Sequence, residues 1–296
     1  MYMEKKVTIL GINGSFGSLF SRLLDKEKQL VITGVDLNEE VYKSSKCSKY
    51  LQSDLTLPDE ELKLLLNKSD VIIICLPEDI AYKFLELYKY HIAKTALVID
   101  TLSVKKEAAL FYVEHHFNAL SLNPMFGPDL QIDGKNIIVV KFKETPVSAW
   151  FISLLKLWKL NIVFATSEEH DKMSSIIQVA AHAAVMAFGI TLNNSDFSLT
   201  ELLKVSTPPF LSLSSLFGRI VSGTKKVYWN IQNENTYASD VRKELIKNLI
   251  ALDESIDNKK ENDFNELIEP KAQDQKDAFK ELSHNFSLQF NQNKTE

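Results

Sequence analysis

The sequence has few cysteines and no excess of basic residues. It contains 2 cysteines among 296 residues, and its 34 lysines and arginines are outnumbered by 39 acidic residues, which gives a net charge of −5. Two cysteines exclude a disulfide framework and predict a reducing compartment, the cytoplasm. Because the charge balance argues against a broad basic face, we expect no nucleic-acid partner.

Metal-ligand spacings and long apolar runs are also missing. The 6 histidines and 2 cysteines form no spaced ligand set, so we predict no metal site. No uninterrupted apolar run reaches the roughly 18 residues that cross a bilayer, so we expect no membrane segment. What remains is a chain with 45% hydrophobic and 25% charged residues, the balance of a globular protein long enough for two domains.

The pattern of the chain changes near residue 165. Before it, short apolar runs alternate with helical spacing, which is typical of βαβ units in a doubly wound parallel sheet. After it, as far as about residue 290, only helix patterns occur. We therefore predict an α/β fold with one domain over residues 1–165 and an all-α domain over residues 166–296. The predicted strands are 7–10, 30–35, 71–76, 97–100, 119–122, 136–140 and 162–164, and the first predicted helix is 16–24.

The second half opens with an apolar stretch, residues 176–190, that contains five alanines. Small residues on a long helix allow another helix to pack closely against it. The sequence leaves two interpretations open, a helix in the core of the domain and a helix at an interface between subunits.

A glycine loop joins the first predicted strand to the first predicted helix. Gly11, Gly14 and Gly17 are placed so that backbone N–H groups can approach a pyrophosphate at a helix N-terminus. Ile12 stands where the strict G-x-G-x-x-G pattern has its first glycine. Asp36 ends the second predicted strand, 22 residues after Gly14, where a carboxylate can accept hydrogen bonds from ribose hydroxyls.

These features together predict a dinucleotide cofactor. NAD is favoured over NADP, because Leu37 and Asn38 offer no positive charge to a 2′-phosphate. Ligands of open α/β sheets lie beyond the carboxyl ends of the strands, so the segments that follow the strands ending near residues 75 and 100 should also line the site. The predicted cofactor-binding residues are Gly11, Asn13, Gly14, Ser15, Phe16, Gly17, Asp36, Leu76, Pro77 and Thr101.

A motif in the middle of the chain resembles a known family signature. The motif is Asn123-Pro124-Met125-Phe126-Gly127-Pro128-Asp129, and it resembles the His-Pro-Met-Phe-Gly-Pro-Asp signature of prephenate dehydrogenases. The resemblance extends over nearly the whole chain. It includes the glycine loop and the segments Asp100–Lys105, Glu169-His170-Asp171, Ile177-Gln178, His182, Phe188-Gly189, Ser206-Thr207-Pro208 and Gly218-Arg219.

The resemblance implies a fold, a reaction and a set of roles. The first domain would be a Rossmann-type domain that binds NAD, and the helical domain would bind substrate and form a homodimer. The reaction would be oxidative decarboxylation of a small cyclohexadienyl dicarboxylate. The catalytic residues would be Asn123, His182, Ser103 and Lys105, and the substrate-binding residues would be Arg219 and Thr207.

Asn123 departs from the family signature, which has a histidine that assists as hydride leaves and a carbonyl develops on the substrate. An amide cannot take a proton near neutral pH, and losing a general base costs about 10²- to 10⁴-fold in rate. Three hypotheses follow. The substrate carries an amine in place of the hydroxyl, as in 4-amino-4-deoxyprephenate. Alternatively, the enzyme uses prephenate with another base, or the chain is a non-catalytic regulator that binds NAD and ligand.

Overall fold

The computed structural model describes residues 4–38 and 46–292. The ends of the two predicted domains, residues 1–3 and 293–296, lie outside the described residues. The chain folds into two compact units: Met1–Ser175 with Trp229–Thr236, and Ile176–Tyr228 with Tyr237–Glu296. We call these the nucleotide unit and the helical unit, and describe each by itself.

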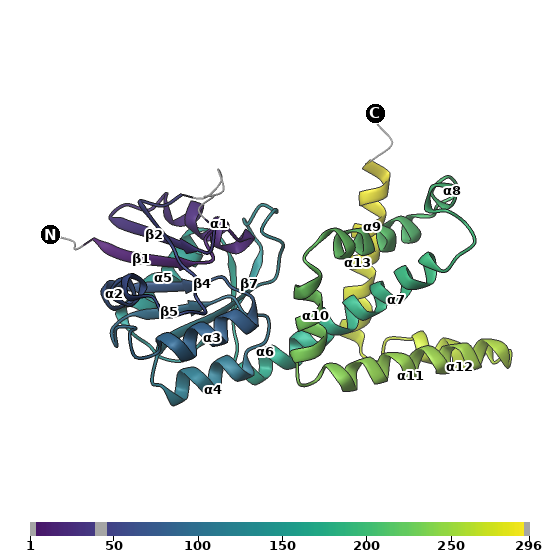
Figure 1. Ribbon diagram of the computed structural model, residues 1–296. Helices are drawn as coiled ribbons and strands as arrows, with labels where there is room; N and C mark the ends of the chain where they lie inside the picture. The colour runs from purple at the N-terminus through teal and green to yellow at the C-terminus, as the bar shows by residue number, and fades with distance from the viewer. Residues whose placement is uncertain (1–3, 39–45, 293–296) are drawn as a thin grey trace. The chain divides into compact units, whose positions relative to one another are not determined.

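The nucleotide unit is built on one eight-stranded sheet (Figure 1). The strand order is β3-β2-β1-β4-β5-β6-β7-β8, and every neighbouring pair is parallel except β6 with β7. The order reverses direction between β1 and β4, which is where doubly wound sheets bind their ligands. The strands are β1 (Lys5–Leu10), β2 (Leu30–Asp36), β3 (Lys49–Gln52), β4 (Val71–Ile74), β5 (Leu97–Asp100), β6 (Asn118–Pro124), β7 (Asn136–Lys141) and β8 (Asn161–Phe164).

The alternation of side chains along each strand creates two cores, one on each face of the sheet. In β4, Val71 and Ile73 belong to the core under helices α1 (Ser15–Leu24) and α5 (Pro146–Leu157). Ile72 and Ile74 belong to the core under helices α2 (Glu60–Lys68), α3 (Glu78–Tyr88) and α4 (Lys106–Glu114). All four side chains are fully buried, so burial on both faces accounts for the continuous run of β-branched residues.

The predicted α/β class is confirmed, with two differences in detail. Strand β3 was not predicted, because its four residues form an exposed edge with lysine and glutamine at its ends. Strand β7 runs antiparallel to β6, because a loop rather than a crossover helix connects the two strands.

After β8, every element in the described part of the chain is a helix. The segments α6 (Ser167–Ser174), the π-helical η1 (Ser175–Ala180) and α7 (Ala181–Asn193) follow one another without a break. In the helical unit Gly189 of α7 lies against the ring of Phe217, which belongs to α9. The remaining helices are α8 (Leu199–Leu203), α9 (Pro208–Ser222), α10 (Lys225–Glu234), α11 (Ala238–Asp257), α12 (Glu261–Ile268) and α13 (Gln273–Gln292).

The helical run Ser167–Asn193 is long and apolar enough to bear on the expectation of no membrane segment. It is 27 residues long, and an 18-residue window within it has a mean hydropathy of 1.7, enough by length and composition to cross a membrane. No uninterrupted apolar run within it reaches 18 residues, so the expectation that the chain has no membrane segment stays a prediction. Only 22% of that window is buried within the chain. A single helix of this kind also occurs in the cores of proteins that never enter a membrane, so the run alone does not identify a membrane protein.

Candidate active site

The glycine loop between β1 and α1 is packed so tightly that side chains are excluded at two positions. Gly11 has a φ of +74°, and a Cβ there would lie 2.4 Å from the carbonyl oxygen of Cys75. A Cβ on Gly17 would lie 2.1 Å from the carbonyl oxygen of Gly11. The loop can therefore bring the first turn of α1 close to the ends of β1 and β4 only with glycine at both positions.

The N-terminus of α1 suits a phosphate group. Gly14 is the N-cap residue and supplies no side-chain cap, and the first turn of the helix contains no acidic residue. The backbone N–H groups of this turn and the positive end of the helix dipole can thus act on an anion. This arrangement fits the pyrophosphate of a dinucleotide.

Ile12 explains why the strict glycine pattern is broken. Its side chain is fully buried in the core of the nucleotide unit. Opposite it lies Gly34 of β2, where an added Cβ would be 2.5 Å from Cδ1 of Ile12. Ile12 occupies the space that a side chain at residue 34 would fill. Its burial there fixes the glycine loop to the core of the nucleotide unit.

Asp36 is held in place by the backbone of two loops. Its Oδ2 accepts the N–H of Asn13 at 2.9 Å, and its Oδ1 accepts the N–H of Leu37 at 2.9 Å. Asp36 and Asp54 line the same cavity of about 320 Å³. Two carboxylates favour ribose hydroxyls and oppose a 2′-phosphate. The cavity is lined by Gly11, Asp36, Leu37, Ser53, Asp54, Leu55, Thr56, Leu76 and Ile80.

Other predicted cofactor residues follow strands β4 and β5 or lie in the first turn of α1. Leu76 lines the cavity. The next residue, Pro77, is the N-cap residue of α3. Thr101 follows β5, and its N–H and Oγ1 both donate to the carbonyl oxygen of Ile74. Phe16 lies edge-on to Phe126, with 6.5 Å between the ring centroids. This contact brings the signature segment against the glycine loop, 110 residues away in sequence.

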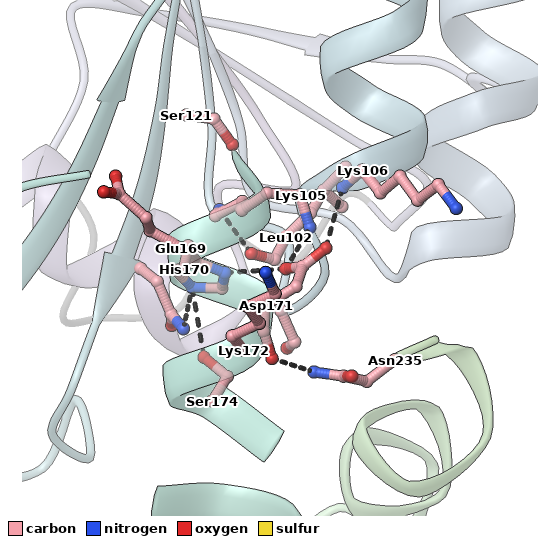
Figure 2. Close-up of polar contacts among 12 residues, drawn as sticks. Leu102, Lys105, Lys106, Ser121, Glu169, His170, Asp171, Lys172, Ser174 and Asn235 are labelled. Carbon is pink, nitrogen blue, oxygen red and sulfur yellow. Dashed lines mark hydrogen bonds and ion pairs between the residues drawn. The ribbon is translucent and has the colours of Figure 1, made fainter. Parts of the chain in front are cut away.

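Asn123 lies near the end of β6 and is 5% exposed. Its Nδ2 is 2.8 Å from Nε2 of His170, a fully buried residue of α6. Nδ1 of His170 is in turn 2.7 Å from Oδ1 of Asp171. Figure 2 shows the His170 ring beside Asp171, with Ser174 one helical turn further on. The three side chains form a buried chain of hydrogen bonds, Asn123–His170–Asp171.

The side chain of Asp171, a residue of α6, contacts the N-terminus of α4. Its Oδ1 accepts the N–H of Lys105 at 2.9 Å, and its Oδ2 accepts the N–H of Lys106 at 3.0 Å. The carbonyl oxygen of Asp171 accepts Nδ2 of Asn235 at 2.8 Å, as Figure 2 shows. A carboxylate at a helix N-terminus interacts favourably with the helix dipole and with the two N–H donors, so these contacts fix the position of the Asp171 side chain.

Lys105 points into the protein. Its side chain is fully buried, and its Nζ donates to the carbonyl oxygen of Leu122 at 2.8 Å, to that of Leu102, and to Oδ1 of Asp100 at 3.4 Å. These acceptors match the three donors of an ammonium group. Burial lowers the pKa of Lys105, and the charge of Asp100 opposes this effect. The geometry therefore favours a structural role for Lys105, which holds the loop after β5 against β6.

Ser103, another predicted catalytic residue, is half-buried within the same loop. Its N–H donates to Oε1 of Glu78 at 2.9 Å, and Oε2 of Glu78 accepts Nδ2 of Asn230 at 2.7 Å. Glu78 is only 7% exposed. Its carboxylate therefore connects the start of α3, the loop after β5 and helix α10.

The protonation of His170 follows from its surroundings. Burial lowers the pKa of His170 below its ordinary value of 6.5, and the hydrogen bond to Asp171 opposes this only in part. The imidazole is thus neutral near neutral pH, with its single proton on Nδ1 facing the carboxylate. Nε2 is then an acceptor, which matches the amide N–H₂ of Asn123.

The remaining predicted site residues belong to the helical unit. His182 of α7 lies edge-on to Tyr228, with 5.0 Å between centroids, and burial lowers its pKa. Its Nδ1 is buried without a hydrogen-bond partner among the described residues. Thr207 is the exposed N-cap residue of α9, and Arg219 lies exposed in the last turns of that helix.

Sequence reasoning left the role of His170 open and did not single out Asp171, Glu78, Asn230 or Asn235. The pair His170-Asp171 was visible as a motif, but nothing in the sequence connects it to Asn123, 47 residues earlier. Glu78 and Asn230 carry no motif at all. Their positions become informative only once the fold brings residues separated by 152 positions into contact.

The fold and this site define an NAD-binding dehydrogenase with a dinucleotide-binding sheet. Two family models match the chain: "Prephenate dehydrogenase, nucleotide-binding domain" over residues 20–135, and "Prephenate dehydrogenase, dimerization domain" over residues 166–270. The chain belongs to the prephenate dehydrogenase family, whose members are NAD-dependent enzymes of oxidative decarboxylation.

Individual relatives agree with this placement. A 4-amino-4-deoxyprephenate dehydrogenase of Streptomyces pristinaespiralis is 28% identical over 269 residues, which cover 89% of this chain and 88% of that protein. A probable arogenate/prephenate dehydrogenase of Methanocaldococcus jannaschii is 24% identical over 90% of this chain, but the match spans only 60% of that protein. The crystal structure of prephenate dehydrogenase from A. aeolicus with hydroxyphenyl propionate and NAD+ has the same fold, with a TM-score of 0.70, 18% identity and coverage of 94% of this chain and 98% of that chain.

Proposed function

We propose that this enzyme catalyses the NAD-dependent oxidative decarboxylation of 4-amino-4-deoxyprephenate to 4-aminophenylpyruvate, with release of CO2 and NADH. The observation that carries the proposal is Asn123, which replaces the signature histidine and makes its side-chain hydrogen bond to the buried His170. The identity of 28% to an enzyme named for this substrate supports it.

The chemistry of an amine explains why an amide can stand at this position. When hydride leaves ring carbon 4, NAD accepts both electrons and the lone pair of a neutral amine forms a C=N bond. Breaking the bond from carbon 1 to its carboxylate then returns an electron pair to the ring, which becomes aromatic. The neutral amine neither gains nor loses a proton overall.

An alcohol on carbon 4 makes a different demand. Its proton must leave as the C=O bond forms, which requires a base such as the histidine of the family signature. Asn123 can accept a hydrogen bond but cannot remove that proton. The substitution thus slows the reaction of the hydroxyl substrate. It does not slow the reaction of the amine, whose lone pair forms the C=N bond without a base.

The remaining predicted residues take these roles in the proposal. Asn123 contacts the carbon 4 substituent, His182 and Thr207 contact the substrate, and Arg219 binds a carboxylate, for which its planar fork is suited. Ser103 lies near the reacting end of the cofactor, and Lys105 positions the loop that carries Ser103. We also propose that the enzyme is a cytoplasmic homodimer that forms through the helical unit, since a dimerization-domain model matches residues 166–270.

The first test is NADH formation by the purified protein with NAD and either prephenate or 4-amino-4-deoxyprephenate. We expect kcat/KM for the amino compound to exceed that for prephenate by about 10²-fold or more. This is the smallest loss of rate expected when a general base is missing. The matched variant is Asn123→His, which should gain activity with prephenate. Faster turnover of prephenate by the wild-type protein would contradict the proposal.

One observation favours prephenate as the second candidate substrate. His182 has a buried Nδ1 without a partner among the described residues, and burial lowers its pKa, so it is neutral and able to accept a proton near pH 7. If prephenate is the faster substrate, His182→Gln should abolish that activity. Absence of turnover with both compounds would instead favour a ligand-binding protein.

A further inference from the structure

We propose that His170 is a positioning residue that fixes the orientation of the Asn123 amide, so that Oδ1 is the atom presented to the carbon 4 substituent of the substrate. This inference rests on the proposed role of Asn123. It adds a specific assignment, since the two ends of an amide have opposite hydrogen-bonding character and only one of them can face the substrate.

The orientation follows from the donors and acceptors around the imidazole. Nδ1 of His170 is 2.7 Å from Oδ1 of Asp171, and a carboxylate oxygen can only accept. The proton of the neutral ring is therefore on Nδ1. Nε2, 2.8 Å from the Asn123 amide, must accept, and only Nδ2 of the amide can donate to it.

Asp171 cannot readily release the imidazole from this tautomer. Its carboxylate also accepts the backbone N–H groups of Lys105 and Lys106 at 2.9 and 3.0 Å, so both oxygens are fixed at the start of α4. His170 is fully buried and Asn123 is 5% exposed, so competition from water is small. A rigid carboxylate orients the ring, and the ring orients the amide.

The consequence for the reaction is an acceptor aimed at the substrate. As the carbon 4 amine becomes an iminium, its N–H groups acquire positive charge and their hydrogen bond to an amide oxygen strengthens. An interaction that is stronger in the transition state than in the ground state accelerates the reaction. The opposite orientation would present Nδ2, a donor that competes for the amine lone pair needed to expel hydride.

Two variants separate this role from a general structural one. His170→Gln keeps an acceptor near the position of Nε2 but loses the bond to Asp171. His170→Asn keeps a donor near the position of Nδ1 for Asp171 but cannot reach Asn123. We expect His170→Asn to lower kcat by about 10- to 100-fold, the order of loss seen when a reacting contact is displaced. His170→Gln should lose less of kcat than His170→Asn, and both variants should keep the wild-type affinity for NAD.

A double-mutant cycle with Asn123→Ala provides the second readout. If His170 acts through Asn123, His170→Asn should cause little further loss of kcat in the Asn123→Ala background. The cycle is run on whichever substrate the protein turns over, so a preference for prephenate would contradict the proposed substrate without affecting this test. Additive losses, or equal losses in the two His170 variants, would overturn the positioning role.

A third readout does not depend on activity. Nitrogen-15 NMR of the histidine side chains at pH 7.5 should show His170 protonated on Nδ1 and not on Nε2. The side-chain amide resonance of Asn123 should be shifted by its hydrogen bond in the wild-type protein and in His170→Gln, but not in His170→Asn. A proton on Nε2 of His170 would overturn the assignment.

The pH profile gives a final check. The charged groups facing His170 are Asp171 on its own helix, Lys105 at the start of α4 and Asp100 of β5. Burial places the His170 pKa below 6.5, so kcat/KM should fall as the pH drops below 6.5 and through that pKa. The reason is that a protonated ring donates from Nε2, which reverses the orientation of the Asn123 amide. His170→Gln should lack this acidic limb.

Discussion

Asp36 accepts two backbone N–H groups, that of Asn13 in the glycine loop and that of the next residue, Leu37. A carboxylate can accept both at once and still has lone pairs for ribose hydroxyls, whereas an amide at this position must turn its N–H₂ group toward one of the backbone donors. The charge of Asp36 is therefore required for the loop as well as for the ligand.

The prediction at this scale is that Asp36→Asn weakens NAD binding. Hydrogen bonds to charged groups contribute about 1.5–3 kcal/mol, so the Kd for NAD should rise roughly 10- to 100-fold. Asp54→Asn is the control, because Asp54 lines the same cavity but its carboxylate bonds only its neighbour Thr56 among the described residues. Isothermal titration with NAD measures both, and equal losses in the two variants would show that only the charge of the cavity matters.

At the scale of elements, the close approach of α7 and α9 depends on one glycine. A Cβ on Gly189 would lie 2.2 Å from Cδ2 of Phe217, in the interior of the helical unit. A Cβ on Gly218, one residue further along α9, meets no atom within 4 Å. An added methyl group would therefore clash at Gly189 and would meet no other atom at Gly218.

We expect alanine at these positions to have opposite effects on stability. Gly189→Ala should lower the free energy of unfolding by about 1–3 kcal/mol, the usual cost of overpacking. Gly218→Ala should raise it by up to about 1 kcal/mol, because alanine is the better helix former. Urea denaturation followed by circular dichroism compares them, and a stable Gly189→Ala protein would show that the two helices can separate without loss.

At the scale of the whole molecule, the apolar surface of the helical unit requires an explanation. Ile177 and Ile190 are 50% and 58% exposed, and Ala181, Ala184 and Ala187 are exposed on the same helical run. The sequence left open whether this segment is a core helix or an interface. Its exposure within one chain, together with the dimerization-domain match, favours an interface with a second copy over a membrane.

The corresponding prediction is a homodimer with twice the chain mass of 33.7 kDa. Ile190→Glu should shift light scattering toward the monomer, because a buried charge without a partner is costly at an apolar interface. Leu157→Glu, at a site 64% exposed at the end of α5, is the control and should stay dimeric. If the wild-type protein instead floats with lipid vesicles and needs detergent to stay dispersed, the helical run lies in a membrane.

The sequence by itself determined the features that depend on neighbouring residues. The strand–glycine loop–helix unit, Asp36 at the end of the next strand and the buried β4 are all set by local spacing and hydrophobic pattern. The family signature and its departure at Asn123 are likewise properties of one continuous segment. These were sufficient for the fold class, the NAD cofactor and the reaction type.

Only the tertiary structure decided what surrounds those residues. It placed His170 and Asp171 beside Asn123, turned Lys105 inward to bind carbonyl oxygens of two segments, and set Ile12 into the space opposite Gly34. The contacts of Asn123 with His170, of Lys105 with Leu122 and of Ile12 with Gly34 join residues 47, 17 and 22 positions apart. These residues meet because neighbouring strands and helices pack into one core. Local pattern specifies which face of an element is apolar, but the identity of the partner across that face is fixed only when the whole unit folds.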